Sequence, residues 1–146
     1  MPQTSSRVGH DEARRAHTGL RDGPGPHATR PGRKFLEVAR LASTEDLDES
    51  LSVAAALAVL AGVAGSDAAC CGVLGRRARG DDHRDAAALL AQIEPGGGQA
   101  AKALLALIDL KDTAHYGLIH VSRRQLTTVT RRASALVAFG EDALRR

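Results

Sequence analysis

The sequence predicts an all-α domain, an antiparallel helical bundle of four main helices with a short helix before them. The 146 residues include two Phe, one Tyr and no Trp. The core must therefore be built from aliphatic side chains and alanine, which suits closely packed helices better than a sheet. Apolar residues also recur at helical spacing through most of the chain beyond residue 33. One domain is expected at this length.

Residues 1–33 differ from the rest in composition. They are polar and rich in Gly, Pro and Arg, and they hold six of the twenty basic residues and three of the seventeen acidic ones. This leaves fourteen of each sign in residues 34–146, so the formal charge of +3 belongs to the tail. We predict a disordered tail over residues 1–33, because it has little apolar surface to bury, and a folded domain over residues 34–146. The tail is either an inert extension or an arm that contacts nucleic acid.

The domain is expected to begin with a short helix and a long one. The pattern around Phe35 suits an amphipathic helix that ends near Ser43. Thr44 is expected to cap a helix over residues 45–74, because its hydroxyl can accept a bond from a free backbone N–H. Gly75 then offers a natural stop.

The long helix is the most apolar part of the chain. Gly62 and Gly65 within it indicate either close contact with another helix or a bend. Its longest apolar stretch, residues 53–66, is shorter than the roughly 18 uncharged residues of a membrane span. Residues 1–33 lack the apolar run of a signal peptide. We therefore expect a cytoplasmic protein without a membrane segment.

Two further helices are expected in the middle of the chain. A charged loop over residues 76–82 leads into a helix over residues 83–93. The Pro-Gly-Gly-Gly run at 95–98 separates it from a helix over residues 99–114, which Gly117 can close in the left-handed conformation.

The last helix has the clearest start signal. Ser122 and Gln125 form a capping-box pattern, and Val121 with Leu126 can form a hydrophobic staple. Basic residues recur along this helix, either as a solvated face or as a surface for RNA or an acidic partner: Arg123, Arg124, Arg131 and Arg132.

Candidate functional side chains gather at the end of the helix over residues 99–114. Lys111 and His115 are four residues apart and share one helix face, which Asp112 borders. Tyr116 follows directly. This combination can bind phosphate or perform general acid–base catalysis. The alternative is that Lys111 and Asp112 are solvated or ion-paired, while His115 and Tyr116 fill the end of the bundle.

A second set of polar residues follows the apolar part of the long helix. Asp67 needs a partner if it faces inward, because an unpaired buried charge is costly. We expect Lys111 or His115 to be that partner; otherwise Asp67 lies at a helix break and meets water. Arg77, in a loop with three arginines in four positions, and His83, which opens the next helix, are candidate phosphate ligands near a helix N-terminus.

The two cysteines predict neither a metal site nor a disulfide framework. Cys70 and Cys71 are adjacent, and the chain has no other cysteine. We expect both to act as small core residues. No metal and no cofactor is expected.

These features resemble the HEPN superfamily. The resemblance covers about residues 34–144. It rests on the long Ala-rich helix, the Gly/Arg loop, the segment DHRDAAALL at 82–90 and the segment LKDTAHYG at 110–117 before a final helix. HEPN domains are small helical bundles that usually dimerise. Many are metal-independent endoribonucleases of toxin–antitoxin and phage-defence systems, often paired with a minimal nucleotidyltransferase, and others bind RNA or nucleotides without catalysis.

Active HEPN members carry an Arg, often followed by a polar residue, with about four to six residues between that Arg and a His. By resemblance, Lys111 stands for this Arg, Asp112 for the polar follower and His115 for the catalytic His. Lys replaces Arg here, and three residues separate it from His115, so both an endoribonuclease and a non-catalytic member stay open. The resemblance implies a homodimer that acts on or binds RNA or a nucleotide.

Two other classes of function also stay open. One is a non-catalytic helical module whose bundle face binds a partner protein. The other is a small nucleic-acid-binding regulator that uses the Arg-rich tail and the last helix.

Overall fold

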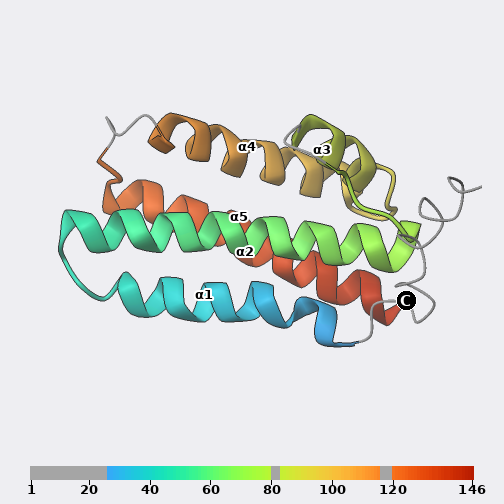
Figure 1. The fold of residues 1–146 in the computed structure, drawn as a ribbon, viewed down its shortest axis with the longest axis horizontal. Helices are drawn as coiled ribbons and strands as arrows, with labels where there is room; N and C mark the ends of the chain where they lie inside the picture. The colour runs from blue at the N-terminus through green and yellow to red at the C-terminus, as the bar shows by residue number, and fades with distance from the viewer. Residues whose placement is uncertain (1–25, 80–82, 116–119) are drawn as a thin grey trace, which may run out of the picture.

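The computed structural model describes residues 26–79, 83–115 and 120–146, and it is all-α over these ranges (Figure 1). A 3₁₀ helix, η2 (Pro26–Thr29), leads into the α-helices. No strand occurs among the residues described, which confirms the predicted fold class. The α-helices are, in chain order, α1 (Arg30–Ala42), α2 (Asp48–Leu74), α3 (His83–Ala91), α4 (Gly97–His115) and α5 (Arg123–Arg145).

Helix α2 is the centre of the bundle, with α1, α3, α4 and α5 packed around it. Helix α1 runs antiparallel to α2, as the short connection between them predicts, and α4 also runs antiparallel to α2 (Figure 1). Helices α2 and α5 form the largest contact of the fold, yet they run in the same direction (Figure 1). The predicted antiparallel arrangement of neighbours therefore holds for α1 with α2 and for α4 with α5. It fails for at least one of the pairs that α3 makes with α2 and α4, because α4 runs antiparallel to α2 although α3 lies between them in sequence.

The contact between α2 and α5 depends on glycine. A Cβ at Gly140 would lie 2.5 Å from the carbonyl oxygen of Gly65, and a Cβ at Gly65 would lie 2.7 Å from the carbonyl oxygen of Leu136. Such distances leave room for hydrogen alone. Gly32 lets α1 approach the same part of α2, since a Cβ at Gly32 would lie 3.3 Å from the carbonyl oxygen of Ala61. Close helix contact, one of the two predicted roles of Gly65, is therefore what the structure shows.

The start of α2 differs from the prediction. Leu47, in extended conformation, occupies the N-cap position without a side-chain cap, and the first turn carries Asp48 and Glu49. The Thr44 hydroxyl instead donates to the carbonyl of Leu41 at 2.7 Å. Thr44 thus completes the end of α1 and does not begin α2. The predicted stop is confirmed, because Gly75 adopts the left-handed conformation, with φ of 67°.

The first helix begins before the predicted domain boundary at Lys34. Pro31 lies in its first turn, where proline needs no backbone donor. Thr29 and Gly32 are buried, and Arg33 forms an ion pair with Glu141 of α5. Residues 26–33 therefore pack as part of the domain, although their Gly and Pro content indicated a tail. The rest of the predicted disordered tail, residues 1–25, lies outside the described residues.

The remaining helices lie close to their predicted positions. Helix α3 ends at Ala91, two residues before the predicted end, although Ile93 stays buried. The capping box of α5 is confirmed, with Ser122 Oγ accepting from the Gln125 N–H at 3.1 Å. Val121 and Leu126 are buried in one cluster, as the staple predicts.

Helix α2 is long and apolar enough, by length and composition, to cross a membrane. Half of its most apolar 18-residue window is buried inside the bundle. Core alanines such as Ala54, Ala58 and Ala61 are fully buried against other helices. The central position of α2 accounts for the apolar residues on its buried sides. One side of the helix stays uncovered, and Val53 and Leu60 are exposed there.

We predict that Gly140→Ala destabilises the protein, because the new Cβ forces α5 away from the Gly65 carbonyl. Overpacking of this kind costs about 1–3 kcal/mol of unfolding free energy. Gly98→Ala is the matched control, since a Cβ there meets nothing within 4 Å. It should be neutral or stabilise by about 0.5–1 kcal/mol. Urea unfolding measures both variants, and equal stability of the two would contradict the close-contact role.

Candidate functional site

Three of the predicted site residues come together where α2 ends and α3 begins. Gly75 turns the chain after α2, so that Arg77 reaches back to Asp67, with 3.6 Å between Nη1 and Oδ2. His83, the first residue of α3, is close enough to act electrostatically on the same carboxylate. The predicted phosphate ligands Arg77 and His83 therefore meet at an acid.

Burial and charge oppose each other at Asp67. Loss of water raises the pKa of its half-buried carboxyl, while the charges of Arg77 and His83 lower it. The burial effect is the larger, so the pKa lies above its ordinary value. The two cationic partners stabilise the carboxylate, but the loss of water outweighs their effect. The anion is therefore less stable here than in water.

The two neighbouring thiols, Cys70 and Cys71, hold their protons more tightly than exposed cysteines do. Burial, and next the charge of Asp67, raise the pKa of Cys70 to about 11. The pKa of Cys71 is also raised by burial and by Asp67. The thiolate is the nucleophile, so a raised pKa makes both cysteines poorer nucleophiles. Cys70 lies in the core cluster, as the sequence predicted, whereas Cys71 is half-buried and lies outside it. No group of three His, Cys, Asp or Glu side chains in the described part of the chain could hold a metal ion.

The expected pairing of Asp67 with Lys111 or His115 is wrong for Lys111. Helix α4 runs antiparallel to α2, and Leu107 lies beside Gly62 (Figure 1). Beyond Leu107, α4 moves toward the start of α2 and away from Asp67. Lys111 and Asp112 are exposed near the other end of the bundle. The side chain of His115, and all of Tyr116, lie outside the described residues.

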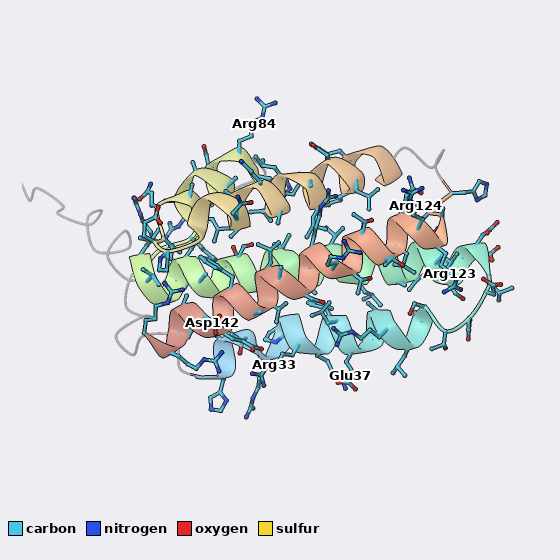
Figure 2. The ribbon with its side chains drawn as sticks, turned by 180° about the vertical axis from the view of Figure 1, so that it is seen from behind. Arg33, Glu37, Arg84, Arg123, Arg124 and Asp142 are labelled. Carbon is cyan, nitrogen blue, oxygen red and sulfur yellow. The ribbon has the colours of Figure 1, made fainter. Side chains whose placement is uncertain are left out.

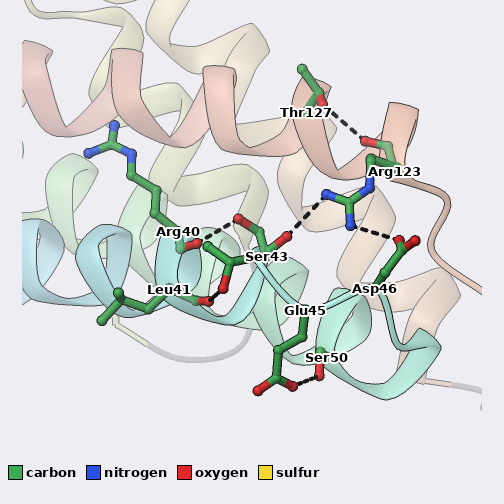
Figure 3. A network of polar contacts seen from close by, with 9 residues as sticks. Arg40, Leu41, Ser43, Glu45, Asp46, Ser50, Arg123 and Thr127 are labelled. Carbon is green, nitrogen blue, oxygen red and sulfur yellow. Dashed lines mark hydrogen bonds and ion pairs between the residues drawn. The ribbon is translucent and has the colours of Figure 1, made fainter.

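Arg123 makes a connection that the sequence did not reveal. Its guanidinium donates to Asp46 Oδ1 at 2.9 Å and to the Ser43 carbonyl at 3.0 Å (Figure 3). It joins the start of α5 to the turn between α1 and α2. These partners lie 77 and 80 residues away in sequence, and no local pattern indicates them. Arg123, one of the set of arginines predicted along the last helix, therefore ties the start of α5 to this turn, and its charge is already paired although the side chain is exposed.

The other arginines of that set are available to a ligand. Arg124, Arg131 and Arg132 are exposed on α5 and make no ion pair within the described ranges. Figure 2 shows Arg124 at the start of α5, at the end of the bundle where α4 finishes. Lys111 lies on α4, one turn before the end of that helix, and is exposed. We call these four residues the basic face: Lys111, Arg124, Arg131 and Arg132.

The raised pKa of Asp67 predicts a pH dependence of stability. The folded protein holds a proton at Asp67 more tightly than the unfolded chain, so this residue's contribution to stability falls as pH rises above its ordinary pKa of 3.8. Asp67→Asn should remove that decline, and Arg77→Ala should steepen it, because Arg77 lowers the pKa. Urea unfolding from about pH 4 to 7 measures the slopes. The same slope in both variants would contradict the assignment.

A comparison of the chain with protein-family profiles, curated proteins and solved structures found no match. The resemblance to the HEPN superfamily therefore stays a proposal that rests on sequence motifs.

Proposed function

We propose that this protein binds RNA through the basic face. The observation that carries the proposal is the distribution of paired and unpaired arginines. Arg33, Arg77 and Arg123 each form an ion pair. Arg124, Arg131 and Arg132 form none within the described ranges, and they follow one another on the exposed side of α5. Unneutralised cations on one face attract a polyanion.

The composition of this surface favours contacts to the phosphate backbone. Binding by base stacking needs exposed aromatic rings. Phe35 and Phe139 are partly buried against the core, and the chain has no Trp. Backbone contacts fix register and carry little sequence information. The protein should therefore bind RNA with low sequence preference.

The choice of RNA over other polyanions is supported by the HEPN resemblance. The same resemblance is the support for proposing a cytoplasmic toxin–antitoxin or defence setting and a nucleotidyltransferase partner. A nucleotide would engage one or two members of the basic face, whereas an RNA strand can engage all four.

We predict that Arg131→Glu with Arg132→Glu weakens RNA binding and flattens its salt dependence. The slope of log K against log salt should fall by about 0.7 for each phosphate of a single strand that the variant no longer neutralises. Fluorescence anisotropy with labelled single-stranded and duplex RNA, and with DNA of the same sequence, measures this. Arg30→Glu with Lys102→Glu makes the same charge change on α1 and α4, away from the basic face. Equal weakening by both double variants, or no binding at low salt, would reject the proposal.

Whether the protein also cleaves RNA is tested separately, with a substitution at His115. Lys111 is exposed, so Lys111→Ala should change the unfolding free energy by less than about 0.5 kcal/mol. We expect RNA binding without cleavage, because a Lys and a three-residue gap replace the active pattern. Incubation of RNA with the protein and a chelator tests this. Cleavage that His115→Ala abolishes in a folded protein would show instead that Lys111 and His115 catalyse.

A protein-interaction module is the second candidate function. The observation in its favour is the uncovered side of α2, where Val53 is 53% and Leu60 46% exposed. Large apolar side chains in a row on a surface indicate an interaction site.

A further inference from the structure

Arginine and threonine alternate along the outer side of α5. Arg124, Thr127 and Arg131 are exposed, and Thr128 is half-buried. Each of the two arginines lies three or four residues from both threonines, so the four share one side of the helix. We call these four residues the Arg–Thr row. Figure 2, in which α5 lies in front of α2, shows Arg124 at one end of it. No acidic residue occurs between positions 122 and 140, so no acid in this part of α5 neutralises the row.

The two threonine hydroxyls of the row are oriented as hydrogen-bond acceptors. Thr127 Oγ1 donates to the carbonyl of Arg123 at 3.0 Å (Figure 3). Thr128 Oγ1 donates to the carbonyl of Arg124 at 3.2 Å. A hydroxyl has one hydrogen to donate and two lone pairs, so each Oγ1 offers only lone pairs to a ligand. These oxygens therefore suit a donor such as another hydroxyl, and they do not suit phosphate oxygens, which only accept.

The row has the same order of groups as an RNA backbone. Arginine supplies charged donors that fit phosphate, and the threonine oxygens accept. Along an RNA strand, phosphates alternate with riboses whose 2′-hydroxyl can donate, and DNA lacks this hydroxyl. Arg124 and Arg131 are two turns apart, about 10 Å along the helix axis, with both threonines between them. The row therefore presents cation, acceptor and cation where RNA presents phosphate, hydroxyl and phosphate.

The surroundings of the row favour a duplex over a single strand. Phe139 is the only aromatic residue of α5 and packs against the core, so α5 offers no ring on which an unpaired base can stack. Exposed Ala135 and Ala138 continue the same side of the helix with small side chains. An A-form duplex displays its 2′-hydroxyls in a wide, shallow minor groove. A rigid helix also binds a rigid duplex without the cost of ordering a flexible strand.

We propose that the Arg–Thr row lies across the minor groove of an A-form RNA duplex. Arg124 and Arg131 contact phosphates there, and Thr127 and Thr128 accept hydrogen bonds from ribose 2′-hydroxyls. The inference rests on the proposed binding of RNA to the basic face, to which both arginines belong. It adds the form of the ligand and the residues that distinguish RNA from DNA. Arginine–phosphate contacts alone hold either nucleic acid, so the preference for RNA depends on the two threonines.

Fluorescence anisotropy of the full chain with labelled duplexes of one sequence tests the proposal. The duplexes are RNA, DNA and 2′-fluoro RNA, which keeps the A-form but has no 2′-hydrogen to donate. The wild type should bind the RNA duplex roughly tenfold more tightly than the 2′-fluoro duplex, as expected for the loss of two hydrogen bonds. It should also bind the RNA duplex more tightly than the single RNA strand.

Substitutions at the threonines assign the preference to their hydroxyls. Thr127→Val with Thr128→Val keeps the branched shape and removes both hydroxyls. This variant should bind the RNA and 2′-fluoro duplexes equally, with its affinity for DNA unchanged, which also shows that it is folded. Thr127→Ser with Thr128→Ser retains the hydroxyls and should keep the preference of the wild type.

Thr44→Val is the matched control for the loss of a threonine hydroxyl. Thr44 is exposed, and its hydroxyl also donates to a carbonyl of the preceding helix, that of Leu41. It lies in the turn between α1 and α2 beside Glu45 and Asp46, whose charges repel a polyanion. Thr44→Val should therefore leave the preference for the RNA duplex unchanged.

The outcomes separate this inference from the proposed function. A wild type that binds no nucleic acid at low salt rejects both. A wild type that binds RNA and 2′-fluoro duplexes equally, or a valine variant that binds DNA normally and keeps the preference, overturns the role of the threonines and leaves RNA binding by the basic face intact. Tighter binding of the single RNA strand than of the duplex overturns the choice of a duplex.

Discussion

The structure depends on the approach of α2 to α5 at Gly65 and Gly140. At this point the backbone of one helix lies directly against the backbone of the other, with no space for a methyl group. Alanines surround the contact, and Ala58, Ala61 and Ala133 are fully buried. Close approach gives a core without large aromatic side chains the many short contacts that dense packing requires. Ser66 fits this core because its hydroxyl donates to the Gly62 carbonyl at 2.9 Å.

The direction of α5 along α2 decides where the polar groups meet. Because α2 and α5 run in the same direction, both helices begin at one end of the bundle (Figure 1). Arg123 can therefore bind the turn before α2, and His120 lies 3.6 Å from Asp48 (Nδ1 to Oδ2). Helix α4 runs the other way, which brings Lys111 to this end and leaves Asp67 at the other with Arg77 and His83.

The bundle thus presents two surfaces of different chemistry on opposite sides. The exposed side of α5 carries cations without ion pairs in the described ranges, and the exposed side of α2 is apolar between charged ends. Binding of a polyanion to a cationic surface weakens steeply with salt, whereas burial of an apolar surface depends mainly on the area removed from water.

The sequence by itself determined the fold class, the five α-helices of the described residues and most of their ends. Helical periodicity, the capping box at Ser122 and the left-handed Gly75 act within a few residues, so local patterns reveal them. The predicted role of Thr44 as the cap of α2 was wrong, because a hydroxyl can also donate to a carbonyl of the helix before it. The sequence also indicated a tail at residues 26–33, because Gly32 looks like a chain breaker until the helix that packs against it is known.

The tertiary structure alone decided which elements meet. The pairs Arg77 with Asp67 and Arg123 with Asp46, and the contact of Gly65 with Gly140, join residues that local spacing does not connect. Loop length indicates that neighbours in sequence run antiparallel, but it does not set the direction of α5 along α2, which the matching of small residues on both helices fixes. The predicted site residues therefore lie in two separate places, because the helix that carries Lys111 runs antiparallel to α2 and ends far from Asp67.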